Sequence, residues 1–145
     1  MTFKSMLRST GSAAVLAAVA LIASAQSGGP LIVLKDVDGN VRPDSIANLE
    51  TLRELSTAPT GVRIWVTFTA EYEPDFLPGT QEFEKQHKKI EKIRQKLISD
   101  LEEIAPSSND YEIATIGPHF AVVTDSNGID FLISETKVTR IFGPA

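Results

Sequence analysis

The sequence predicts an α+β fold in which two helices cover one face of a four-stranded antiparallel sheet and leave the other face bare. Residues 61–70 alternate between apolar and polar side chains, as a half-buried strand does. A long amphipathic helical pattern follows over residues 80–105. The rest of the chain has the pattern of strand, strand, short helix and strand. Two strand–helix–strand halves therefore fit within residues 61–145.

The N-terminus has the pattern of a secretory signal peptide. Lys4 and Arg8 precede an apolar run, Ala13 to Ile22, which ends in Ala23-Ser24-Ala25. The run is too short to span a bilayer, which takes about 20 residues. We expect residues 1–25 to be removed, giving a secreted or periplasmic protein that starts near Gln26. An uncleaved N-terminal anchor is the competing interpretation.

Charge and cysteine content narrow the possible partners and stabilising bonds. The chain has 14 basic and 19 acidic residues, and without Lys4 and Arg8 its net charge is −7. This sign argues against a nucleic-acid partner. No cysteine is present, so neither a disulfide nor a lipoprotein anchor can form, and burial alone must stabilise a single core. We expect no stable membrane association after signal cleavage.

Residues 26–60 are predicted to form an N-terminal arm with a short strand and a helix. The apolar run at 31–35 suggests the strand, and the turn at 36–40 follows it. Three carboxylate or amide residues of this turn match the first, third and fifth positions of a calcium loop. Val41 and Ala47 occupy positions where such a loop needs glycine and glutamate, so an ordinary turn is favoured. The helix is predicted from four apolar residues at every third position, Ile46, Leu49, Leu52 and Leu55.

The strand predicted over 61–70 has two distinct faces. One carries aliphatic and aromatic residues that should face the helices, Val62, Ile64, Val66 and Phe68. The other carries Arg63, Trp65, Thr67 and Thr69. The chain's single tryptophan is therefore expected on the uncovered side of the sheet, where it is a plausible binding anchor. Burial of Trp65 under the N-terminal arm is the alternative.

The long helix is predicted to begin after Thr80, which can cap it, and to end at Pro106. Its apolar stripe consists of Phe83, Ile90, Ile93, Leu97, Leu101 and Ile104. The other face carries a basic run, Lys85, Lys88, Lys89, Lys92, Arg94 and Lys96. Such a run can contact an acidic surface or anionic lipid, but interleaved glutamates favour a solvated face.

The second half completes the fold. Tyr111 to Ile116 is a predicted strand, and Gly117-Pro118 turns the chain into a third strand, His119 to Thr124. Asp125 or Ser126 can cap a short helix, which precedes a last strand, Lys137 to Phe142. The resulting order, βαββαβ, predicts a ferredoxin-like domain over residues 61–145.

Catalysis is not expected. His87 lies in the long helix and His119 lies beside a turn, and the chain has no nucleophile or zinc-binding motif. Two isolated histidines make a poor metal site. The sequence predicts no catalytic residues, no metal site and no cofactor.

Three of the predicted strands resemble those of the propeptide domain of subtilisin-like serine proteases. They are Arg63-Ile64-Trp65-Val66-Thr67-Phe68, His119-Phe120-Ala121-Val122-Val123 and Lys137-Val138-Thr139-Arg140-Ile141. The second is similar to a strand in which that family usually has Gly-Phe-Ala-Ala. The resemblance spans residues 61–145.

This resemblance implies an inhibitor or folding chaperone of a subtilisin-like protease. In that family the bare sheet face packs on the enzyme and the C-terminal segment lies along the substrate cleft. The residues implied to bind the protease are Arg63, Trp65, Thr67, Phe142, Gly143, Pro144 and Ala145. Only four residues follow Ile141, fewer than in family propeptides, so binding through the sheet face is favoured over insertion of the tail. The alternative function is an exported ferredoxin-like module that binds another protein or a ligand, unrelated to proteolysis.

Overall fold

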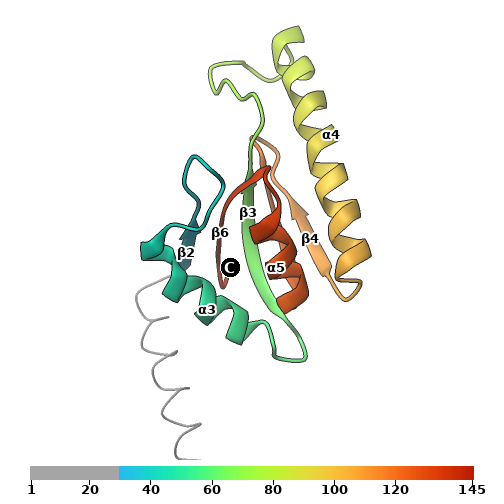
Figure 1. Ribbon diagram of the computed structural model, residues 1–145. Helices are drawn as coiled ribbons and strands as arrows, with labels where there is room; N and C mark the ends of the chain where they lie inside the picture. The colour runs from blue at the N-terminus through green and yellow to red at the C-terminus, as the bar shows by residue number, and fades with distance from the viewer. Residues whose placement is uncertain (1–29) are drawn as a thin grey trace, which may run out of the picture. The chain divides into compact units, whose positions relative to one another are not determined.

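The computed structural model describes residues 30–145, so the predicted signal peptide lies outside the described residues (Figure 1). One compact unit spans Ile32–Ala145. Its elements are β2 (Leu31–Leu34), η1 (Pro43–Ser45), α3 (Ile46–Leu55), β3 (Val62–Phe68), α4 (Gln81–Ile104), β4 (Asn109–Ile113), β5 (His119–Thr124), α5 (Ser126–Ser134) and β6 (Val138–Gly143). None of the helices within residues 30–145 combines the length and apolar character needed to cross a membrane.

The α+β class is confirmed, but the sheet has five strands where the sequence predicted four. Their order is β2-β6-β3-β5-β4, and β3 pairs antiparallel with both β5 and β6. The fifth strand is β2 of the N-terminal arm, which lies beside β6; next to it, the Lys35 N–H donates to the Thr139 carbonyl at 3.2 Å. This addition gives backbone partners to an edge of β6 that would otherwise be unpaired.

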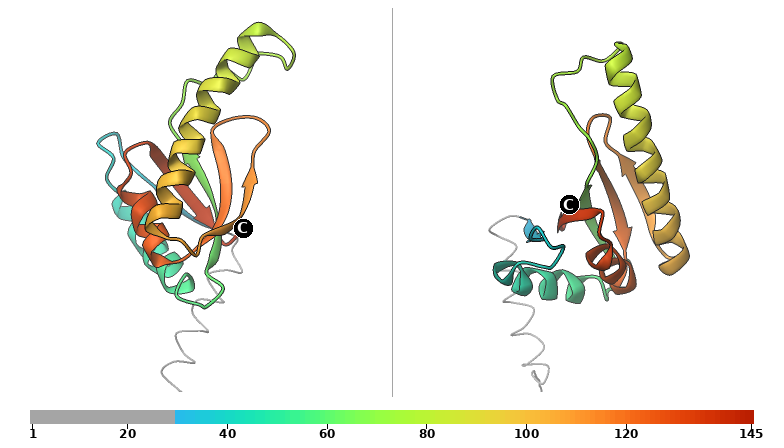
Figure 2. Two further views of the ribbon diagram at one scale, coloured as in Figure 1. Left: turned by 90° about the vertical axis from the view of Figure 1, so that its right-hand side faces the viewer. Right: turned by 45° about the horizontal axis from the view of Figure 1, so that its top comes forward.

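The α-helices of residues 30–145, α3, α4 and α5, lie on one side of the sheet, as the left view of Figure 2 shows. The predicted apolar face of β3 is confirmed, because Val62, Ile64, Val66 and Phe68 are all buried. Their core partners are Phe120, Val122, Ile141, Ile90, Leu97, Leu101, Ile129 and Leu132. The arm helix α3 contacts α5, so it joins the same helical layer.

Both predicted helix caps are present. The Thr80 hydroxyl accepts the Phe83 N–H at 3.2 Å, and the Asp125 carboxylate accepts the Gly128 N–H at 3.0 Å. Two finer predictions are wrong. The strand expected from Tyr111 to Ile116 begins and ends earlier, as β4, and Ile104 is 49% exposed because it lies at the end of α4.

The largest correction concerns Arg94, which was predicted on the solvated face of the long helix and is only 1% exposed. Its guanidinium pairs with Glu91 and lies 5.9 Å from the centre of the Phe68 ring. It also donates to the carbonyl oxygens of Gly117 at 3.1 Å and Ala114 at 3.4 Å. Arg94 therefore ties the turn between β4 and β5 to α4, and these partners allow its charge to be buried.

The outer edge of β2 is closed by the arm itself. The Leu34 N–H donates to the buried Ser45 hydroxyl at 3.0 Å, and the Leu34 carbonyl accepts the Arg42 N–H at 2.9 Å. The Asn48 side chain donates to the Ile32 carbonyl at 2.9 Å. These bonds occupy backbone groups that another strand would need for pairing.

Replacing Arg94 should test its structural role. We expect Arg94→Ala to lower the free energy of unfolding by about 2–4 kcal/mol, because two carbonyls lose a donor and a cavity opens beside Phe68. Arg94→Met, which keeps most of the packing, should cost less. The control is Arg53→Ala at the exposed Arg53–Asp130 pair, which should cost about 0–1 kcal/mol in urea unfolding. Equal costs for Arg94→Ala and Arg53→Ala would contradict this role.

Candidate functional site

The sheet face opposite the helices is the candidate site, and we call it the open face. Cross-strand pairing places its side chains in rows, since directly opposed residues of antiparallel strands share a face. One row runs through Phe142, Trp65 and Ala121, and the next runs through Arg140, Thr67 and His119. The described part of the arm, residues 30–60, does not cover Trp65, because β2 extends the sheet edge and α3 packs with α5.

A shallow cleft of about 290 Å³ lies on the open face. It is lined by Trp65, Ala114, His119, Arg140 and Phe142. Trp65 and Phe142 are cross-strand neighbours and are both half-buried. The cleft therefore presents partly exposed aromatic surface next to polar groups, a composition suited to protein recognition.

Three side chains in the second row form a hydrogen-bonded chain. The Arg140 Nε–H donates to the Thr67 hydroxyl at 3.2 Å, and this hydroxyl lies 3.1 Å from His119 Nδ1. Burial lowers the pKa of His119, and the charges of Arg140 and Arg94 lower this pKa further. The arrangement suits a neutral imidazole whose Nδ1 accepts the Thr67 O–H.

Tyr72 lies near the start of β5, close to the His119 ring. A Cβ on Gly117 would lie 3.1 Å from the His119 ring and 3.8 Å from the Tyr72 ring, so both rings border the same small space. Gly117 also has a φ of +86°, a conformation that side chains disfavour. Glycine at this position thus leaves the space between the backbone and the His119 ring free of a side chain.

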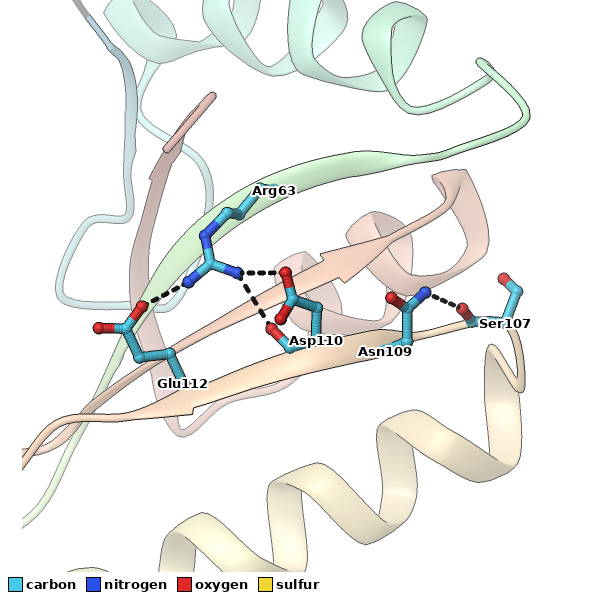
Figure 3. Close-up of polar contacts among 5 residues, drawn as sticks. All are labelled: Arg63, Ser107, Asn109, Asp110 and Glu112. Carbon is cyan, nitrogen blue, oxygen red and sulfur yellow. Dashed lines mark hydrogen bonds and ion pairs between the residues drawn. The ribbon is translucent and has the colours of Figure 1, made fainter.

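At the other end of the open face, Arg63 is held by residues of its own chain (Figure 3). It reaches across β5 to β4, where its guanidinium contacts the Asp110 carboxylate and carbonyl, both at 3.0 Å, and the Glu112 carboxylate at 2.5 Å. Asp110 has a φ of +56°, within the irregular part of the β4–β5 pairing. This irregularity also makes β4 a poor template for another strand.

The C-terminal tail is docked on the sheet. Phe142 and Gly143 belong to β6, and the Ala145 N–H donates to the Arg63 carbonyl at 2.8 Å. A Cβ on Gly143 would lie 2.7 Å from the same carbonyl, so the tail approaches β3 closely. Pro144 and Ala145 follow the last strand. Inserting this tail into an enzyme would require breaking its contact with Arg63.

The predicted protease-binding residues thus divide into three groups. Trp65, Thr67 and Phe142 are brought together at the cleft. Arg63 shares their face but is already paired with Asp110 and Glu112. Gly143 and the two residues after it, Pro144 and Ala145, lie beside Arg63 of β3.

Three cleft residues were not predicted as site residues: Ala114 and the two polar residues, His119 and Arg140. Residue alternation could have found both, since His119 precedes the apolar run of its strand and Arg140 stands two positions before Phe142.

Neither a search for metal-binding groups nor comparison with known proteins assigns a further role to these residues. Within residues 30–145, no group of three or more His, Asp or Glu side chains is placed to hold a metal ion. Comparison with protein-family models, curated proteins and solved structures found no match to this chain.

His119 should make stability depend on pH. Because its pKa is lower in the folded protein than the unfolded value of about 6.5, its stabilising effect is complete above pH 6.5 and is lost as pH falls through the folded pKa. His119→Asn can still accept a hydrogen bond from Thr67 but cannot titrate.

Urea unfolding between pH 5 and 8 should therefore show a steeper loss of stability at acid pH for the wild-type protein than for this variant. Both proteins keep His87, so the difference isolates His119. Parallel pH profiles would contradict the assignment.

Proposed function

We propose that the protein, once exported, binds a subtilisin-like serine protease through its open face and acts as an inhibitor or folding chaperone. The observation that carries the proposal is the half-exposed Trp65–Phe142 pair beside a cleft, on the sheet face that no helix of the described residues covers. Because both sheet edges are unsuited to pairing, a partner should dock on this face. The protein has no catalytic role in this proposal.

The topology supports the proposed resemblance to subtilisin propeptides. Without β2, the strand order is β6-β3-β5-β4, and α4 and α5 connect β3 to β4 and β5 to β6. Two interleaved strand–helix–strand units of this kind make a ferredoxin-like domain. In this proposal β2 and α3 are an addition to that domain, which leaves its open face free.

Inhibition assays should show the role of Trp65 directly. We expect purified residues 26–145, which contain the whole compact unit, to inhibit subtilisin or proteinase K. Trp65→Ala should weaken inhibition about tenfold or more, since a central aromatic anchor is lost. Ile104→Ala is the matched control, because it removes an exposed apolar side chain from α4 and should change little. Absence of both inhibition and a complex at micromolar concentration would reject the protease as partner.

Deleting Pro144 and Ala145 separates the sheet face from the tail. These residues lie past β6, so their loss leaves the strand and the cleft in place. Binding through the open face predicts inhibition within about twofold of the full-length value, a free-energy change below about 0.5 kcal/mol. Loss of inhibition with folding retained would instead assign the mechanism to the tail.

The second candidate is an exported module that binds a different protein or a ligand through the same cleft. The docked tail favours this candidate, because the Ala145 N–H donates to the Arg63 carbonyl. This hydrogen bond keeps the tail on the sheet, where it cannot lie in a substrate cleft as a substrate mimic. A complex that depends on Trp65 but forms with no subtilisin-like enzyme would select this candidate.

A further inference from the structure

Arg140 and Arg63 differ in what their guanidinium groups contact, although both lie on the open face. Both terminal nitrogens of Arg63 form ion pairs, one with the Asp110 carboxylate and one with the Glu112 carboxylate. Arg140 makes no ion pair with any residue between 30 and 145. Its charge is therefore not neutralised within the described part of the chain.

The Arg140 guanidinium is nevertheless held in a defined orientation. Its Nε–H is bound by the Thr67 hydroxyl, and its Cζ lies 5.6 Å from the centre of the Phe142 ring. The two terminal nitrogens make no hydrogen bond within residues 30–145. A planar guanidinium fixed at Nε in this way leaves its terminal N–H groups free for a fork-like contact with a carboxylate.

We propose that Arg140 is a specificity residue of the open face, which binds a carboxylate of the partner protein beside an apolar side chain placed in the Trp65–Phe142 cleft. This inference rests on the proposed docking of a partner at that face. The carboxylate belongs to an aspartate or glutamate side chain, since the fork matches the two oxygens of that group. Trp65 supplies apolar contact area in the cleft. Arg140 selects partners in which the residue that occupies the cleft has an acidic neighbour.

A peptide titration tests the inference without any protease. Residues 26–145, labelled with ¹⁵N, are titrated at pH 8, where His119 is neutral, with acetyl-Phe-Asp-Phe-amide and with the matched Asn peptide. We expect the Asp peptide to bind severalfold more tightly and to shift the Arg140 Nε–H and Trp65 indole signals. Arg140→Gln should erase the preference. Lys92→Gln, which makes the same change in net charge on α4, should retain it.

Equal binding of the two peptides, or a preference that survives Arg140→Gln, would overturn the inference. Measuring the binding of the same variants to subtilisin distinguishes this outcome from failure of the proposed function. If subtilisin binds, Arg140→Gln should weaken the complex about tenfold and reduce its salt dependence, whereas Trp65→Ala should weaken it at every salt concentration. If subtilisin does not bind but the Asp preference holds, the protease is rejected as partner and the carboxylate site is retained.

Discussion

One-sided burial of the sheet is the constraint on which the rest of the structure depends. β3, which lies between β6 and β5, points Val62, Ile64, Val66 and Phe68 into the core. The same pleat directs Arg63, Trp65 and Thr67 to the opposite face. All three α-helices lie on the core side, so the chain of residues 30–145 leaves its tryptophan at the surface of the other side.

The additions to this sheet protect its edges and leave the open face accessible. Ser45, Asn48 and Arg42 occupy backbone groups along β2, while the irregularity at Asp110 disrupts β4. Arg94 stabilises the layer between helix and sheet by holding the turn after β4. With the edges closed and one face covered by helices, the part of the sheet that stays accessible is the open face, which carries the cleft.

Much of this arrangement was predictable because it depends on local patterns. Alternation in β3 gave the correct faces. Thr80 was predicted as a cap, and Asp125 as one of two alternatives, because their hydrogen bonds reach only three residues along the chain. Burial of Arg94 could not be predicted in the same way. Its partners Ala114 and Gly117 are backbone carbonyls brought near by the tertiary fold, so in the sequence Arg94 is one more residue of a basic run. The position of β2 likewise depends on pairing with β6, more than 100 residues later.

The candidate site was predictable in part for the same reason. Trp65 and Thr67 follow from the alternation of a single strand, whereas the cleft needs His119 and Arg140 from two other strands in a fixed register. Hydroxyl-radical footprinting of residues 26–145, alone and mixed with subtilisin, tests the central claim most directly. Docking on the open face predicts protection of Trp65 and Phe142 in the complex, with α4 and α5 unchanged. Protection of the helical layer with Trp65 still fully reactive would contradict it.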